Sequence, residues 1–91
     1  MNQPETDFKL EDLPNIGSTL AGILRESGIN TPDELFENGT SQTFARIRAF
    51  NSGACFSKLC AIEGAIKGIR WHKLAKEKKV ELKQFFTMIN K

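Results

Sequence analysis

The most constraining feature of this sequence is an apolar stripe in its second half. Between residues 55 and 69, side chains that favour burial recur at intervals of four, three, four and three residues. They are Cys55, Leu59, Ile62, Ile66 and Ile69. These intervals match the 3.6-residue turn of an α-helix, whereas a strand would alternate every second residue. The spacing predicts a helix over 55–69 with one continuous buried face.

Small residues form a seam beside this stripe: Ser57, Ala61, Gly64, Ala65 and Gly68. A glycine inside a helix costs about 1 kcal/mol relative to alanine. Close approach of another helix would offset that cost, so we expect the seam to pack against a neighbouring helix. The predicted helix is too short and too polar to span a membrane.

Turn and capping signals divide the first half of the chain. A brief helix at 7–13 is expected to enter Pro14, and Ser18 is a candidate N-cap for the next helix. That helix should end at Gly28, which suits the left-handed position after a helix, with Ile29 as the accompanying apolar contact.

The stretch TPDEL carries the clearest helix start in the sequence. Thr31 is the expected N-cap, Pro32 takes the first helical position, and Glu34 completes a capping box. We expect this helix to stop at the NGT of 38–40 and a further helix to cover 41–50.

A last helix is expected over 76–89, with these apolar residues mostly on one side: Val80, Leu82, Phe85, Phe86 and Ile89. No segment alternates with a period of two over a strand's length. The sequence therefore predicts an all-α fold, a single compact bundle of five or six short helices. We place an N-terminal tail or helix start at 1–9 and the helical domain at 10–90.

Length and composition exclude several classes of protein. The 91 residues suffice for one domain with a modest core, and no stretch approaches the ~20 apolar residues of a membrane span. The acidic N-terminus lacks the apolar region of a signal peptide. We therefore expect a cytoplasmic protein.

The sequence contains no persuasive catalytic constellation. It has no nucleophile motif around its serines, no phosphate-loop or dinucleotide fingerprint, and one histidine, His72. Cys55 and Cys60 point away from each other on a helix, so we expect buried thiols without a disulfide. The spacing of these residues also matches no metal site. We predict a non-enzymatic protein without metal or cofactor.

The net charge of +2 is unevenly distributed. Residues 1–39 hold two basic and eight acidic side chains, which give −6, and residues 40–91 hold eleven basic and three acidic ones, which give +8. Such asymmetry points either to a charged partner or to docking of one half on the other.

The stretch LPNIGSTLAGIL at 13–24 is typical of the hairpin in a helix–hairpin–helix motif. Amide N–H groups at the positive end of a helix dipole form an anion site, and glycine lets the backbone approach closely. The candidate phosphate contacts are Asn15, Ile16, Gly17, Ser18 and Thr19. DNA-binding hairpins usually add a cation soon after the glycine. Here the first is Arg25, so the hairpin has no nearby cation in the sequence.

A second candidate surface lies in the basic half of the chain. Its members are Lys67, Arg70, Lys73, Lys76, Lys78, Lys79 and Lys83. Such a surface either contacts phosphates in a salt-dependent way or is a solvated helix face. If the protein binds nucleic acid, we expect the lysines near the C-terminus to contribute most of the affinity.

Trp71 also has two interpretations. It either anchors the corner before the last helix or remains exposed as a hot spot for a partner protein. His72 is expected beside it, at the surface or at the boundary of the core. Glu63 is expected to pair with Lys67 on the helix surface at the i, i+4 spacing.

Several segments together resemble the C-terminal domain of the TfoX (Sxy) family. They are LPNIG, SGINTPDEL, CFSKLCAIEGAIKGIRWHKL and KKVEL, and they span about residues 10–86. The signature residues, mainly structural in role, are Leu13, Pro14, Ile16, Gly17, Glu63, Gly64, Gly68 and Trp71. The resemblance implies an all-helical, helix–hairpin–helix-like domain. Two-domain members regulate competence for DNA transformation in bacteria, and we expect this chain to be the C-terminal domain standing alone.

Two functions remain open from the sequence. The first is a regulatory domain with weak, salt-dependent and sequence-independent association with nucleic acid. The second is a protein–protein interaction module without DNA binding, in which the acidic and basic halves recognise a regulatory protein or a second copy. Neither involves a membrane, and the oligomeric state is left open.

Overall fold

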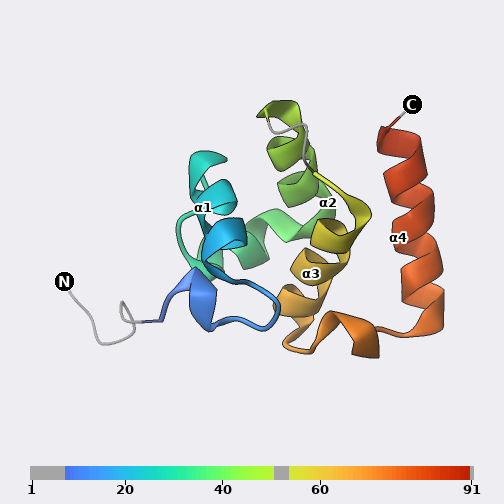
Figure 1. Ribbon diagram of the computed structural model, residues 1–91, viewed down its shortest axis with the longest axis horizontal. Helices are drawn as coiled ribbons and strands as arrows, with labels where there is room; N and C mark the ends of the chain where they lie inside the picture. Colours follow the sequence, from blue (N-terminus) through green and yellow to red (C-terminus); the bar gives the residue numbers. More distant parts are fainter. Residues whose placement is uncertain (1–7, 51–53, 91) are drawn as a thin grey trace.

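Four α-helices and two 3-10 helices follow one another along residues 8–50 and 54–90, the part of the chain that this computed structural model describes (Figure 1). In order they are η2 (Leu10–Asp12), α1 (Ser18–Glu26), α2 (Pro32–Phe50), α3 (Phe56–Lys67), η3 (Trp71–Lys73) and α4 (Lys76–Ile89). The all-α prediction is confirmed for these residues. The predicted number of five or six helices is wrong, and most of the predicted tail lies outside the described residues.

The segment before the hairpin is shorter than predicted. The expected helix at 7–13 is one 3-10 turn, η2, so the hairpin has a full α-helix only on its C-terminal side. The N-cap of α1 is Gly17 rather than Ser18, which is the first helical residue. The predicted end is confirmed, because Gly28 has a φ of 93° and Ile29 is fully buried.

The start of α2 at Pro32 and the Thr31 N-cap are confirmed, but the Glu34 carboxylate accepts from Asn30, one residue before the N-cap that a capping box uses. The N–H of Glu34 donates to the Thr31 hydroxyl at 3.1 Å, and the Glu34 carboxylate accepts the N–H of Asn30 at 2.6 Å. The predicted break at 38–40 is confirmed, although the helical segments on either side of it are joined in one element, α2. Gly39 interrupts it with φ 79° and ψ 171°, because this left-handed backbone is accessible to glycine without strain.

Helix α3 occupies the middle of the fold, in contact with α2, α4 and η3 (Figure 1). Every residue from 59 to 65 is buried, so all sides of this segment are covered. The helix is shorter than the predicted 55–69. Cys55 is its N-cap, and Gly68 is its left-handed C-cap rather than an interior residue.

Helix α4 closes one side of the fold, and its predicted bounds of 76–89 are confirmed. Leu82 is buried, and Phe86 packs against the rings of Phe44 and Phe56 with centroids 6.0 and 5.7 Å apart. Val80 was expected on the apolar side but is 50% exposed. No helix within the described ranges has the length and apolarity needed to cross a membrane.

Candidate functional site

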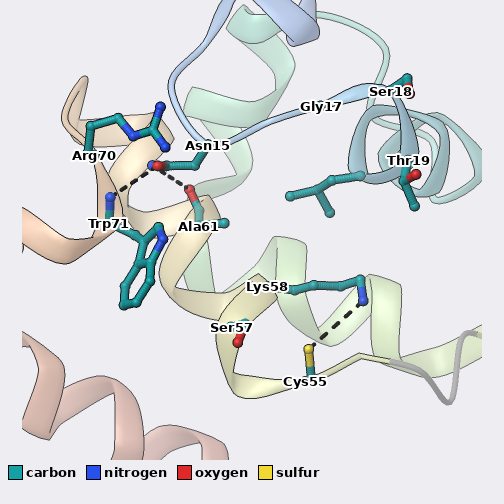
Figure 2. A pocket seen from close by; sticks show the side chains of 11 residues that line it. Asn15, Gly17, Ser18, Thr19, Cys55, Ser57, Lys58, Ala61, Arg70 and Trp71 are labelled. Carbon is teal, nitrogen blue, oxygen red and sulfur yellow. Dashed lines mark hydrogen bonds between the residues drawn. The ribbon is translucent and has the colours of Figure 1, made fainter.

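The hairpin is attached to the end of α3 by the side chain of Asn15. Its amide donates to the carbonyl of Ile69 at 2.9 Å and to that of Ala61 at 3.4 Å. Its Oδ1 accepts the N–H of Trp71 at 3.0 Å (Figure 2). Asn15 has a φ of 71°, and asparagine is one of the few residues that adopt this conformation readily. One side chain thus links two segments that are about fifty residues apart in the sequence.

Gly64 makes this attachment feasible. A Cβ at this position would lie 2.5 Å from Asn15 Nδ2, 2.8 Å from the carbonyl oxygen of Ile69 and 3.3 Å from Trp71 Cα. The close approach expected at the small-residue seam is therefore present. It is made by the hairpin and by the chain after α3, rather than by another helix as predicted.

An open groove of about 580 Å³ lies beside this attachment, between the hairpin and α3 (Figure 2). One wall is the N-cap and first turn of α1, residues 17–20, with Asn15. The other wall comes from the start of α3, including Lys58, and from Arg70 and Trp71. Three of the five predicted phosphate contacts, Gly17, Ser18 and Thr19, are exposed here, whereas Ile16 is buried in the core.

The groove contains the cations that the hairpin lacks in sequence. Lys58 and Arg70 both line it, and the Lys58 ammonium lies 3.9 Å from the Cys55 sulfur. The N-cap Gly17 has no side chain with which to cap the first amides of α1. Positive side chains and the positive end of a helix dipole therefore meet in one concave surface.

Arg25, the first cation after the hairpin in sequence, has a different role. Its guanidinium donates two hydrogen bonds to the Glu11 carboxylate, at 2.8 and 3.0 Å. This hydrogen bonding holds the pKa of Glu11 at about 2. Arg25 thus joins α1 to η2 and does not line the groove.

The predicted basic surface divides into several environments. Lys67 and Lys78 form ion pairs with carboxylates, Lys79 donates to the carbonyl of His72, and Lys83 lies 5.0 Å above the centroid of the Phe56 ring. Arg70, Lys73 and Lys76 are exposed and make no ion pair with the rest of the described chain. Several of the lysines therefore already have partners within the fold.

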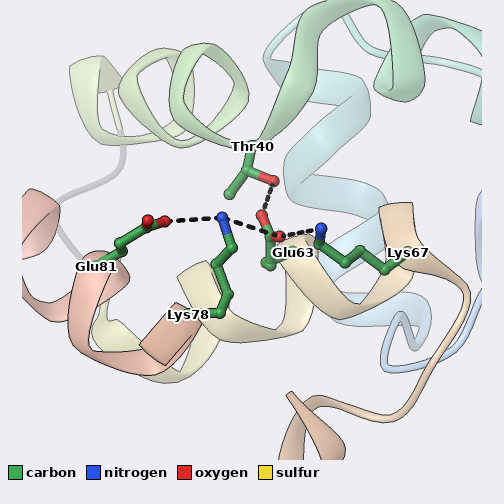
Figure 3. Close-up of polar contacts among 5 residues, drawn as sticks. All are labelled: Thr40, Glu63, Lys67, Lys78 and Glu81. Atoms are coloured by element: carbon green, nitrogen blue, oxygen red, sulfur yellow. Dashed lines mark hydrogen bonds and ion pairs between the residues drawn. The ribbon is translucent and has the colours of Figure 1, made fainter. Parts of the chain in front are cut away.

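Glu63 is the buried member of a charge cluster that joins three helices (Figure 3). Its carboxylate accepts the hydroxyl hydrogen of Thr40 at 2.6 Å and lies 3.4 Å from the Lys67 ammonium and 3.9 Å from that of Lys78. The predicted Glu63–Lys67 pair is confirmed. The expectation of a surface residue is wrong, since Glu63 is only 6% exposed. Burial follows from the central position of α3, which the spacing alone does not reveal.

Neutralising Glu63 should therefore weaken the contact between α2, α3 and α4. We expect Glu63→Gln to lower the free energy of unfolding by about 1–3 kcal/mol, because it leaves two ammonium groups beside a neutral, buried amide. The matched control is Glu81→Gln, whose side chain is 67% exposed and pairs with Lys78 at 2.8 Å. That change should leave the free energy of unfolding almost unchanged, because solvent screens an exposed ion pair. Urea unfolding of both variants tests this, and equal losses would contradict it.

The other candidate residues lie outside any reactive arrangement. Both cysteines are free thiols, and the predicted burial is confirmed for Cys60, whereas Cys55 is only half-buried. Burial raises the pKa of Cys60. His72 is exposed beside Trp71, as expected. Within residues 8–50 and 54–90, no group of three or more His, Cys, Asp and Glu is arranged to hold a metal ion.

Sequence reasoning missed Lys58 as part of the site. Lys58 is about forty residues from the hairpin, and although it lies within the segment CFSKLCAIEGAIKGIRWHKL, it was not among the candidate residues. The one signal in the sequence was Gly64, a helical glycine that required a close neighbour. Gly64 did not indicate which segment packs against it. The identity of that segment determines which cations line the groove.

Comparison with known proteins gives one family. Residues 6–86 match the family described as the TfoX C-terminal domain. The chain is similar to two crystal structures from Listeria monocytogenes, one of an uncharacterized protein in a triclinic form and one of a protein of unknown function in a tetragonal form. The first is 46% identical, with 90% of this chain and 93% of that chain covered and a TM-score of 0.88. The second is 48% identical, with 88% and 99% covered and a TM-score of 0.86. No curated protein matches. The chain therefore belongs to the TfoX C-terminal domain family.

Proposed function

We propose that this protein is a non-enzymatic, competence-regulator-like domain of the cytoplasm that associates weakly with nucleic acid through the phosphate backbone. The observation that carries the proposal is the groove beside the hairpin, which Lys58 and Arg70 line together with the exposed first turn of α1. Membership of the TfoX C-terminal domain family supports a regulatory role.

The chemistry of the groove favours phosphate over base edges. Backbone amides at a helix start and cationic side chains are the groups that proteins use for phosphate oxygens. Contacts of this kind carry no sequence information, so binding should be independent of sequence and fall steeply with salt. In this proposal the hairpin contacts the phosphate backbone as in a helix–hairpin–helix motif, and the cations that assist it come from α3 and from the loop after α3.

The basic residues outside the groove give a second contribution. Lys73 and Lys76 are exposed, whereas Lys78 pairs with Glu63 and Glu81. We therefore propose that the groove, rather than the lysines near the C-terminus, contributes most of the affinity for nucleic acid. The two surfaces can be separated, because each offers two cations for a matched substitution.

Binding of a labelled duplex and of a labelled single strand, at about 50 and 200 mM salt, tests the proposal. Lys58→Gln with Arg70→Gln should weaken binding at low salt by tenfold or more. It should also lower the salt dependence by roughly one unit of log–log slope per cation. Lys73→Gln with Lys76→Gln removes the same charge outside the groove and should have the smaller effect. Circular dichroism checks that both variants fold.

Two outcomes would count against this function. No binding of either nucleic acid at low salt would overturn it, and a larger loss in the Lys73 and Lys76 variant would show that the groove is not the binding surface. The competing function is a protein-interaction module, favoured by the exposed apolar side chains of Trp71, Val80 and Met88. That function would be supported instead if the protein does not bind nucleic acid but self-associates in sedimentation experiments and dissociates at high salt.

A further inference from the structure

Trp71 is an exposed aromatic residue at the end of the groove. Trp71, the one tryptophan of the chain, is 46% exposed and lines the same groove as Arg70 and Lys58 (Figure 2). A tryptophan that served only to anchor the corner would be covered by the core. The alternative of an exposed contact residue therefore agrees better with its position.

The backbone of Trp71 is held in place although its side chain is exposed. The Trp71 N–H donates to Asn15 Oδ1 at 3.0 Å. Trp71 is also the first residue of η3, and its carbonyl accepts the N–H of Leu74, the C-cap of this turn, at 3.2 Å. The imidazole of His72 contacts the indole edge to face, with centroids 6.1 Å apart. An exposed ring on a fixed backbone loses little conformational entropy when a ligand covers it.

The combination of this ring with the adjacent cations narrows the class of ligand. Proteins that bind single strands combine a positive groove along the backbone with aromatic side chains on which bases stack. A paired base inside a duplex presents no free face to an indole, whereas a base in a single strand does. We infer that the groove binds single-stranded nucleic acid, with phosphates near Lys58, Arg70 and the first turn of α1 and with a base stacked on Trp71. This inference rests on the proposed function and specifies its ligand.

The protein itself carries the probe for this inference. The chain has one tryptophan and no tyrosine, so its indole fluorescence comes from Trp71 alone. Stacking of a base on the indole should quench that fluorescence. Titration with a short oligothymidylate strand should therefore reduce the emission of the unmodified protein in a saturable way. An abasic strand of equal length should bind more weakly and leave the emission unchanged. A matching oligouridylate shows whether the sugar matters.

Two substitutions separate stacking from charge. Trp71→Leu should weaken binding of the oligothymidylate by about five- to a hundredfold, the effect of losing one stacked base. Its affinity for the abasic strand should stay the same. Trp71→Phe keeps an aromatic face and should recover most of the affinity for the oligothymidylate. Both variants retain the backbone N–H that Asn15 accepts, and their unfolding transitions verify that they fold.

The outcomes distinguish the two levels of the proposal. Two results together would establish the inference. The single strand should quench the indole fluorescence, and the protein should prefer the single strand over a duplex, a preference that Trp71→Leu should abolish. Equal binding of duplex, abasic and base-bearing strands without quenching would overturn stacking and leave the phosphate-binding function standing. Failure of all strands to bind would overturn both.

Discussion

Replacing Gly64 with alanine is expected to destabilise the domain by about 1–3 kcal/mol, although alanine is the better helix former. The gain in helix propensity is about 1 kcal/mol. Against it, the new Cβ would lie 2.5 Å from Asn15 Nδ2 and 2.8 Å from the carbonyl oxygen of Ile69. The carbonyl belongs to the backbone that follows α3 and also accepts a hydrogen bond from Asn15, so it cannot move without breaking that bond. Overpacking should therefore outweigh propensity.

The chain offers a matched control in Gly22, which lies inside α1. A Cβ at this position would meet no atom within 4 Å, so Gly22→Ala should raise the free energy of unfolding by roughly 0.5–1 kcal/mol. Thermal unfolding measures both changes, with a shift of about 4–8 °C per kcal/mol for a domain of this size. An increase in the melting temperature for both variants would show that the end of α3 relaxes to admit a methyl group.

Replacing Asn15 with alanine should have the larger effect, a loss of about 2–4 kcal/mol. The change removes three hydrogen bonds, each worth about 1 kcal/mol, and leaves the Ile69 carbonyl and the Trp71 N–H without this partner. Alanine also pays about 1 kcal/mol to adopt the φ of 71°. Asn15→Gly loses the same hydrogen bonds without that backbone cost, so it should be about 1 kcal/mol more stable than Asn15→Ala. Urea unfolding with constant m-values tests the order.

A double-mutant cycle ties the two sites together. If the Asn15 amide contributes to the clash with a methyl group at position 64, then Gly64→Ala should lower the free energy of unfolding by less in the Asn15→Gly background. We expect a coupling free energy of at least about 0.5 kcal/mol. Strictly additive effects would mean that the backbone around Ile69 accounts for the whole cost at Gly64.

Local signals predicted the helices well because the physics that sets them is local. The capping residues around Thr31 satisfy amides within one turn, and Gly28 ends α1 through its own backbone preference. The 4-3-4-3 spacing identified α3 for the same reason. Errors arose where a local preference had two outcomes. Gly68 is the example, because it caps α3 instead of lying inside it, whereas the break predicted at 38–40 is present as the kink at Gly39.

The candidate site was predicted only in part, since its two walls are far apart in sequence. The hairpin residues Gly17, Ser18 and Thr19 were recognised from their motif, but the position of Lys58 opposite them depends on how α3 is docked. Glu63 shows the same limit. Its pairing with Lys67 follows from helical spacing, whereas its burial and its bond to Thr40 depend on the packing of α2 against α3.

The sequence by itself determined the all-helical class, the positions of most helix ends and the family signature, because capping, periodicity and glycine preferences act over a few residues. Only the tertiary structure decided how the hairpin part of the signature contacts the part at the end of α3. Asn15 reaches across to Ala61, Ile69 and Trp71, and Gly64 leaves room for it to do so. This attachment sets Arg70 and Trp71 beside the hairpin, and the docking of α3 adds Lys58. These long-range contacts depend on the complementary shapes of segments that the sequence separates by about fifty residues.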